Sequence, residues 1–361
     1  MGLFVLGGLK FSRLALLLLL LFVMFNVGGL FSMLTMSDFK NIPLYLSVSL
    51  FLGLTAVFWS VVIAADMGRL RVIFRGFVAA ALITALAGIA GYFHLFPGAE
   101  VFTRYNRAMG IFQDPNVFGP FLITPILYLV YGILYRNIST SIVRLGILAV
   151  LLFGLFLSFS RGAWGGCLLS GSIFYLLLIL AETSPRKRSQ LILVAVFGVM
   201  AAALLLIFAL QFDAVSDMFS ERAKVVQDYD GQRLGRFARH AIGFEWALEN
   251  PLGIGPMEFG IILDEDTHNI WVKALMAYGW LGFVSWFAII VTTLVAGGRL
   301  VLKNRPWQPF LMCAWSAFVA HLFLGWVIDM DHWRHFYLLI GIIWGCMALE
   351  MQHRAVPEKI I

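Results

Sequence analysis

The chain of 361 residues is 61% hydrophobic and only 13% charged. This composition excludes an ordinary water-soluble globular domain, in which about a quarter of the residues are charged. The formal net charge is +6 at pH 7, but the basic residues lie in the connections between apolar runs, which argues against a nucleic-acid-binding surface.

Long apolar runs dominate the chain, and many approach or exceed the roughly 20 residues that a helix needs to cross a bilayer. A β-barrel would instead show short alternating segments. The first run is too long for the core of a signal peptide and has no small-residue cleavage site, so we expect a retained span. We predict an all-α, polytopic transmembrane helical bundle of about ten spans: 14–33, 43–65, 77–97, 117–135, 145–160, 163–181, 191–211, 271–297, 308–328 and 336–350.

The connections between these spans alternate between basic and acidic compositions. Because basic connections tend to stay in the cytoplasm, we expect both termini inside the cell, which agrees with an even number of spans. The loops 98–116, 212–270 and 329–335 then face outward. All three cysteines fall inside predicted spans, so no disulfide framework is implied: Cys167, Cys313 and Cys346.

We therefore divide the chain into an N-terminal transmembrane region (1–211, seven spans), a large outer loop (212–270), and a C-terminal region (271–361) with three spans and a tail. Apolar spacing in the loop predicts an amphipathic turn or two within 213–229 and a helix over 234–249. A turn-forming segment with two glycines and two prolines follows at 251–256.

The predicted loop helix carries Arg233, Arg236 and Arg239 at three-residue spacing, near one face. Such a cluster can be a solvated face or bind anionic lipid. We favour phosphate binding because the other charges of the loop are mostly acidic, and guanidinium groups meet phosphate oxygens in pairs. Further candidates at predicted outer boundaries are Arg104, Arg107, Arg161 and Arg334.

His268 follows three acidic residues, 264–266, and lies just before a predicted span. A histidine titrates near neutral pH and can move a proton. The nearby carboxylates either favour its protonated form, which hinders a base, or orient the ring as in a catalytic triad. Both alternatives stay open.

The segment 329–335 contains two aspartates, two histidines and an arginine. These side chains can ligate a metal, but their spacing matches no established metal signature. We favour a polar cap over the same outer site and predict no metal and no cofactor.

Four segments together resemble the O-antigen ligase and O-antigen polymerase superfamily of membrane glycosyltransferases. They follow one another over roughly 105–285, in the family's order. They are Met109–Asn116 at the start of a middle span, Ser160-Arg161-Gly162, Arg236 followed by the Pro-x-Gly-x-Gly turn from Pro251, and His268-Asn269 with Gly279 in a His-x10-Gly pattern.

The resemblance implies transfer of a glycan from undecaprenyl diphosphate on the periplasmic face of the bacterial inner membrane. The acceptor is lipid A–core for a ligase of lipopolysaccharide biosynthesis, or a second lipid-linked glycan for a polymerase. It implies that Arg161 and Arg236 hold the diphosphate and that His268 is the base or orients the acceptor. We take these three as catalytic. Substrate contacts are expected from Arg104, Arg107, Arg233, Arg239, Asn269 and Arg334.

Two other functions are considered beside this one. A lipid-linked glycan transporter typically shows repeated halves and charged, broken helices at midplane, and we find no internal repeat. A non-catalytic scaffold leaves the arginines and His268 unexplained. Between ligase and polymerase, the short chain and small outer loop slightly favour a polymerase-like function.

Overall fold

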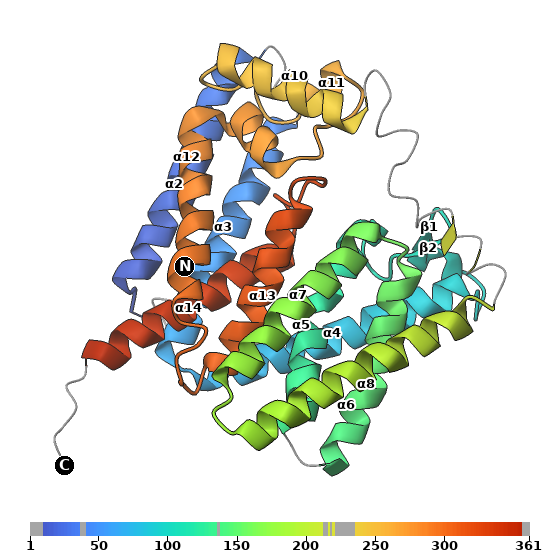
Figure 1. Cartoon of the computed structure of the whole chain (residues 1–361). Helices are drawn as coiled ribbons and strands as arrows, with labels where there is room; N and C mark the ends of the chain where they lie inside the picture. The colour runs from blue at the N-terminus through green and yellow to red at the C-terminus, as the bar shows by residue number, and fades with distance from the viewer. Residues whose placement is uncertain are drawn as a thin grey trace. The chain divides into compact units, whose positions relative to one another are not determined.

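A computed structural model describes residues 10–36, 41–135, 138–211, 216, 219–220 and 235–355, without the side chains of 138–140, 202, 205, 209 and 236. Most of the amphipathic turns predicted within 213–229, and Arg233, lie outside these residues. The described part is almost entirely helical (Figure 1). Its α-helices are α2 (Arg13–Ser32), α3 (Ile42–Ala65), α4 (Gly68–Tyr92), α5 (Pro115–Tyr135), α6 (Ile138–Leu157), α7 (Arg161–Ala181), α8 (Pro185–Ala209), α10 (Arg236–Glu249), α11 (Glu258–Ile262), α12 (Ile270–Gly298), α13 (Gln308–Leu324) and α14 (Arg334–Ala355).

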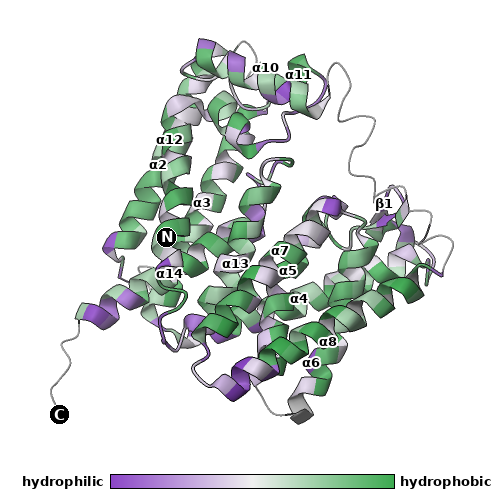
Figure 2. Cartoon of the chain, in the orientation of Figure 1, coloured by the Kyte–Doolittle hydropathy of each residue, from purple (hydrophilic) through white to green (hydrophobic). Residues whose placement is uncertain are grey.

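Eight of the described helices are long and apolar enough to cross a membrane, and two shorter apolar helices, Ser141–Leu157 and Gln308–Leu324, accompany them. Together they coincide with the ten predicted spans, so the all-α polytopic fold is confirmed. Figure 2 shows the hydrophobic colouring along these helices. The largest boundary difference is α4, which begins at Gly68 rather than at 77. The arginines before 77 are good helix formers, so the helix extends beyond its apolar part.

The described chain forms two compact units. The first unit comprises Met1–Arg71, Val226–Leu300 and His321–Ile361. Within it, α2 packs along α12 and α3 packs along α14. The ring of Phe25 in α2 stacks on Tyr278 in α12 with a centroid distance of 3.8 Å. Apolar contacts between long helices therefore hold together the segments that carry the candidate site.

Helix α12 is broken at Gly279, where φ is 61° and ψ is −173°. In a regular helix the Trp280 amide would bond to the Met276 carbonyl. Instead the Trp280 amide donates to the carbonyl of Pro251 at 3.0 Å, and the Met276 carbonyl accepts from the amides of Ile254 and Gly255 at 2.9 and 3.3 Å. The predicted turn at 251–256 thus fills the break and satisfies its backbone groups.

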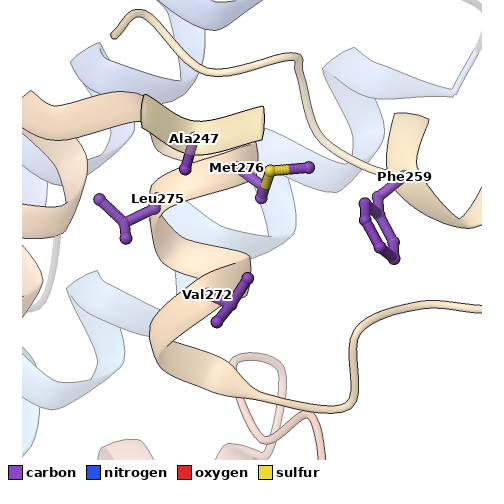
Figure 3. Packing of buried hydrophobic residues seen from close by; sticks show 5 residues of the cluster. All are labelled: Ala247, Phe259, Val272, Leu275 and Met276. Atoms are coloured by element: carbon purple, nitrogen blue, oxygen red, sulfur yellow. The ribbon is translucent and has the colours of Figure 1, made fainter. Parts of the chain in front are cut away.

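The predicted loop helix exists as α10 and begins at Arg236, two residues later than expected. One face of α10 packs on α12 through an apolar cluster that α11 completes (Figure 3). Figure 3 shows its buried residues: Ala247, Phe259, Val272, Leu275 and Met276. This packing attaches the helix that carries the candidate arginines to the first turns of the span that follows His268.

The second unit comprises Val72–Val225 and Val301–Ala320, and α5 packs on α6 and α7 within it. The predicted loop 98–116 contains a 3-10 helix, Ala99–Phe102, and a hairpin of β1 (Thr103–Arg104) and β2 (Arg107–Ala108). Tyr105 and Asn106 between the strands have φ values of 54° and 55°. We missed this hairpin because strands of two residues are too short to show an alternating pattern.

Candidate functional site

The backbone of His268 is fixed by the start of α12. The residue has φ of 51°, a left-handed conformation that is uncommon outside glycine. The next residue, Asn269, is the N-cap: its Oδ1 accepts from the amides of Trp271 and Val272 at 3.0 and 3.2 Å. Its Nδ2 donates to the carbonyl of Trp326 at 3.3 Å. The structure thus gives Asn269 a capping role, while its predicted substrate contact stays a prediction.

Both ring nitrogens of His268 face carboxylates. Nε2 lies 3.0 Å from Oε1 of Glu265, and Nδ1 lies 3.3 Å from Oδ2 of Asp329. A carboxylate only accepts hydrogen bonds, so satisfying both contacts requires a proton on each nitrogen. The hydrogen bond to Asp329 raises the pKa of His268; burial opposes this increase, and Glu265 adds to it. Of the two alternatives left open above, this geometry favours the protonated form.

Arg239 reaches the same carboxylate from α10. Its side chain is buried, and its Nη1 pairs with Oε2 of Glu265. Burial alone would raise the pKa of Glu265, but its hydrogen bonds with Arg239 and His268 lower it. Arg236 begins α10, and its side chain is outside the described residues. Arg239 is therefore the member of the predicted arginine cluster that the structure joins to His268.

Lys273, in the first turn of α12, is not among the site residues predicted from the sequence. Its side chain is 12% exposed, and its Nζ lies 2.8 Å from Oδ2 of Asp266. The same nitrogen lies 3.7 Å from Oδ2 of Asp329 and 3.6 Å from Oδ1 of Asp331. A lysine inside an otherwise apolar span marks a functional position. The sequence alone could therefore have indicated Lys273, because it is a charged residue within the predicted span 271–297.

The segment 329–335 meets the His268 region through its aspartates: Asp329 contacts His268, and Asp331 contacts Lys273. Its predicted role as a polar cap over the site stays a prediction. Asp331 accepts from the hydroxyl of Tyr45 at 2.5 Å and lies 2.9 Å from Nδ1 of His332. Burial would raise the pKa of Asp331, but the charge of Lys273 and the bond with His332 lower it. Burial by itself would lower the pKa of His332, but the hydrogen bond with Asp331 and the charge of that carboxylate raise it above its ordinary value.

No group of three or more metal-ligating side chains occurs among the described residues. Arg334, the first residue of α14, is exposed. Its predicted contact with substrate stays a prediction.

The second unit holds the remaining candidate arginines. Arg107 is buried; its Nε donates to the carbonyl of Ser158 at 2.7 Å, and its Nη2 donates to Oδ1 of Asn116 at 2.8 Å. Arg104 is exposed and donates to the carbonyl of Gln113 at 3.0 Å. Arg161 begins α7 and is half-buried. Arg107 therefore ties the β1–β2 hairpin to the start of α5 and to the residue that follows α6. Substrate binding by these arginines stays a prediction.

Asp329→Asn is expected to weaken the pH dependence of stability. A histidine whose pKa is raised by folding stabilises the fold fully below its ordinary value of about 6.5, and this contribution disappears as the pH rises through the raised value. The parent should therefore lose stability above about pH 6.5, and the variant less so because the largest cause of the shift is gone. Thermal unfolding between about pH 6 and 9 measures this. An identical pH dependence in both proteins would contradict the Asp329 pairing.

Comparison with known proteins gives one match within the chain. Residues 146–287 match a family model described as O-antigen ligase. No curated protein matches the chain. The matched residues include Arg161, Arg239 and His268, while Asp329 lies beyond them.

Proposed function

Residues 146–287 match a family model described as O-antigen ligase, and on this similarity we propose that the protein is a membrane glycosyltransferase of the O-antigen ligase/polymerase superfamily. The protein transfers a glycan from undecaprenyl diphosphate to the hydroxyl of a glycan acceptor. The reaction takes place on the periplasmic face of the bacterial inner membrane, with both termini in the cytoplasm. The acceptor is either lipid A–core or a second lipid-linked glycan.

One observation carries this proposal: His268 lies between Asp329 and a Glu265–Arg239 ion pair. Glycan transfer needs a group that takes a proton from the acceptor hydroxyl, and a positioned histidine performs this task well. It also needs cations for the negative charge that gathers on the departing diphosphate. Both kinds of group meet in this network.

His268 must lose a proton before it can accept one. Glu265 is the more exposed of its two carboxylate partners, with a side-chain exposure of 54% against 17% for Asp329. We therefore assign Glu265 as the contact that opens and Asp329 as the contact that stays on Nδ1. An incoming diphosphate competes with Glu265 for Arg239. Glu265 then takes the proton of Nε2 as its contact with His268 opens, and the neutral imidazole can accept the proton of the acceptor hydroxyl at Nε2.

Arginines neutralise the leaving diphosphate in this proposal, and no metal or cofactor takes part. Arg236 and Arg161 keep the diphosphate-binding roles that the family resemblance assigns to them. Within the first unit, Arg239 offers its guanidinium to the diphosphate once Glu265 moves. Removing one preorganised donor of this kind typically raises the barrier by about 3 kcal/mol.

Glycan transfer by the purified protein tests the proposal. Undecaprenyl-diphosphate-linked oligosaccharide is the donor, and lipid A–core and a second lipid-linked glycan are offered as separate acceptors. Transfer supports the proposal, and the acceptor used distinguishes ligase from polymerase. Donor binding without transfer to either acceptor would contradict it; movement of the bound donor across a vesicle membrane would then indicate a transporter.

A further inference from the structure

Lys273 is the cationic centre of a cluster that the proposed chemistry does not use directly. Its Nζ contacts Asp266, Asp329 and Asp331, and its side chain is almost fully enclosed. We propose that Lys273 is a positioning residue for His268, which holds Asp329 in place against Nδ1 of the imidazole. This inference rests on the proposed function, because it gives Lys273 a role in the same reaction.

A single oxygen atom connects the two side chains. Oδ2 of Asp329 lies 3.3 Å from Nδ1 of His268 and 3.7 Å from Nζ of Lys273. Oδ1 of Asp329 is buried and has no hydrogen-bond partner among the described residues. The orientation of this carboxylate therefore depends on Oδ2. Without Lys273, Oδ2 of Asp329 keeps its contact with His268 but loses the second contact that fixes the carboxylate.

The surrounding charges make the lysine necessary. Asp266 approaches from the loop before α12, while Asp329 and Asp331 approach from the loop between α13 and α14. From α3, the ring of Tyr45 lies 6.0 Å from Nζ. Carboxylates that share one site cannot all stay ionised unless a cation offsets their repulsion. Lys273 is in contact with all three carboxylates, so its positive charge offsets their mutual repulsion beside His268.

His332 and Glu265 complete the set of titratable groups around the pair. Nδ1 of His332 lies 2.9 Å from Oδ2 of Asp331, and Glu265 contacts Nε2 of His268. Neither bonds to Asp329 in the described contacts. Among the described contacts, Lys273 is thus the basic group besides His268 that touches Asp329.

The direction in which the pKa of His268 changes when Lys273 is removed distinguishes two roles for the lysine: positioning Asp329, or acting on the imidazole through its charge alone. A positive charge near an imidazole lowers its pKa, so removing a lysine that acts only through space raises it. If Lys273 acts through Asp329, its removal releases that carboxylate, whose hydrogen bond is the largest cause of the raised pKa of His268. The pKa of His268 then falls.

Lys273→Met tests this directly, because methionine keeps an unbranched chain without the charge. The His268 pKa is measured by NMR of protein labelled at histidine in lipid nanodiscs, and the signal is assigned with His268→Asn. A fall of the pKa in Lys273→Met supports the proposal. A rise or no change overturns it. Lys10→Met, at an exposed terminal position, is the matched control and should leave the signal unchanged.

Two further measurements keep the test decisive. In the transfer assay, Lys273→Met should lower kcat by about 10-fold to 100-fold with little change in donor KM, as expected for a misplaced catalytic group. Its effect should be strongly non-additive with that of Asp329→Asn; additive effects would overturn the proposal. If Lys273→Met does not fold, the charge-balanced double variant Lys273→Met/Asp331→Asn takes its place and should show the same fall in pKa.

These outcomes separate the two proposals. Absence of transfer by the parent protein contradicts the proposed function. The NMR titration still decides whether Lys273 positions Asp329, since it needs no turnover.

Discussion

Replacing His268 with asparagine is expected to lower kcat for glycan transfer by about 10²-fold to 10⁴-fold, the contribution typical of a positioned acid or base. Asparagine cannot take up the proton of an acceptor hydroxyl at neutral pH. It also removes the pairing with Asp329, so the orientation and the proton acceptor are lost together. The donor KM should change less than kcat, because the arginines proposed to bind the diphosphate are intact.

The control for this variant is His94→Asn. His268 and His94 have nearly the same left-handed backbone, with φ values of 51° and 50°, and asparagine tolerates that conformation better than most residues. The two substitutions therefore impose the same local backbone change. His94 is exposed and belongs to the second unit, so its variant should retain the parent's rate. Equal rates in His268→Asn and the parent would exclude His268 as the proton acceptor.

Gly279→Ala is expected to destabilise the protein by at least about 3 kcal/mol and to abolish transfer. The backbone at Gly279, with φ of 61° and ψ of −173°, is in a region that is essentially open only to glycine. A Cβ at this position would also lie 2.5 Å from the carbonyl oxygen of Leu252. Neither atom can yield without moving the turn at 251–256 away from α12.

Thermal unfolding and the transfer assay measure both effects. Gly171→Ala is the matched control, because a Cβ on this helical glycine meets no atom within 4 Å. Alanine is the better helix former by about 1 kcal/mol, so the control should be as stable as the parent or slightly more stable. A Gly279→Ala protein with the parent's unfolding temperature would show that the break in α12 is not required.

The break also explains the spacing of two sequence motifs. The His-x10-Gly pattern joins His268 to Gly279, and the Pro-x-Gly-x-Gly pattern lies at 251–256. Hydrogen bonds between this turn and the broken helix connect the two patterns directly. The glycines therefore allow the backbone conformations that these hydrogen bonds require. Their effect on the site is to hold α12 in position against α10, the helix that carries Arg239.

The helical spans were predictable because a bilayer-crossing helix leaves a strong and local signal. A helix of about twenty apolar residues forms its backbone hydrogen bonds within itself, so the span can be predicted from that segment of the sequence alone. The loop helix α10 was predictable for a related reason, since apolar residues recur at helical spacing over its full length. By contrast, the hairpin β1–β2 forms by pairing across a two-residue turn. Strands of two residues are too short to give a sequence pattern that predicts this pairing.

The candidate site was predictable only in part. His268 and the loop arginines stood out because charged and titratable residues are scarce in this chain. Which arginine approaches His268 depended on how α10 rotates against α12, and the structure selects Arg239 among the described side chains. Lys273 was visible in the sequence as a charge within a span, but nothing there joined it to Asp329.

The sequence by itself determined that this protein is a multi-pass helical membrane protein with O-antigen ligase-like motifs and a candidate functional histidine before a late span. These properties depend on composition, local periodicity and short motifs. Only the tertiary structure decided that His268 lies between Glu265 and Asp329 and that Lys273 holds three aspartates. The contacts of His268 and Lys273 with Asp329 and Asp331 join residues about 60 positions apart in the chain. They form only when helix packing brings the segments at 264–273 and 329–332 together, a long-range condition that local pattern does not encode.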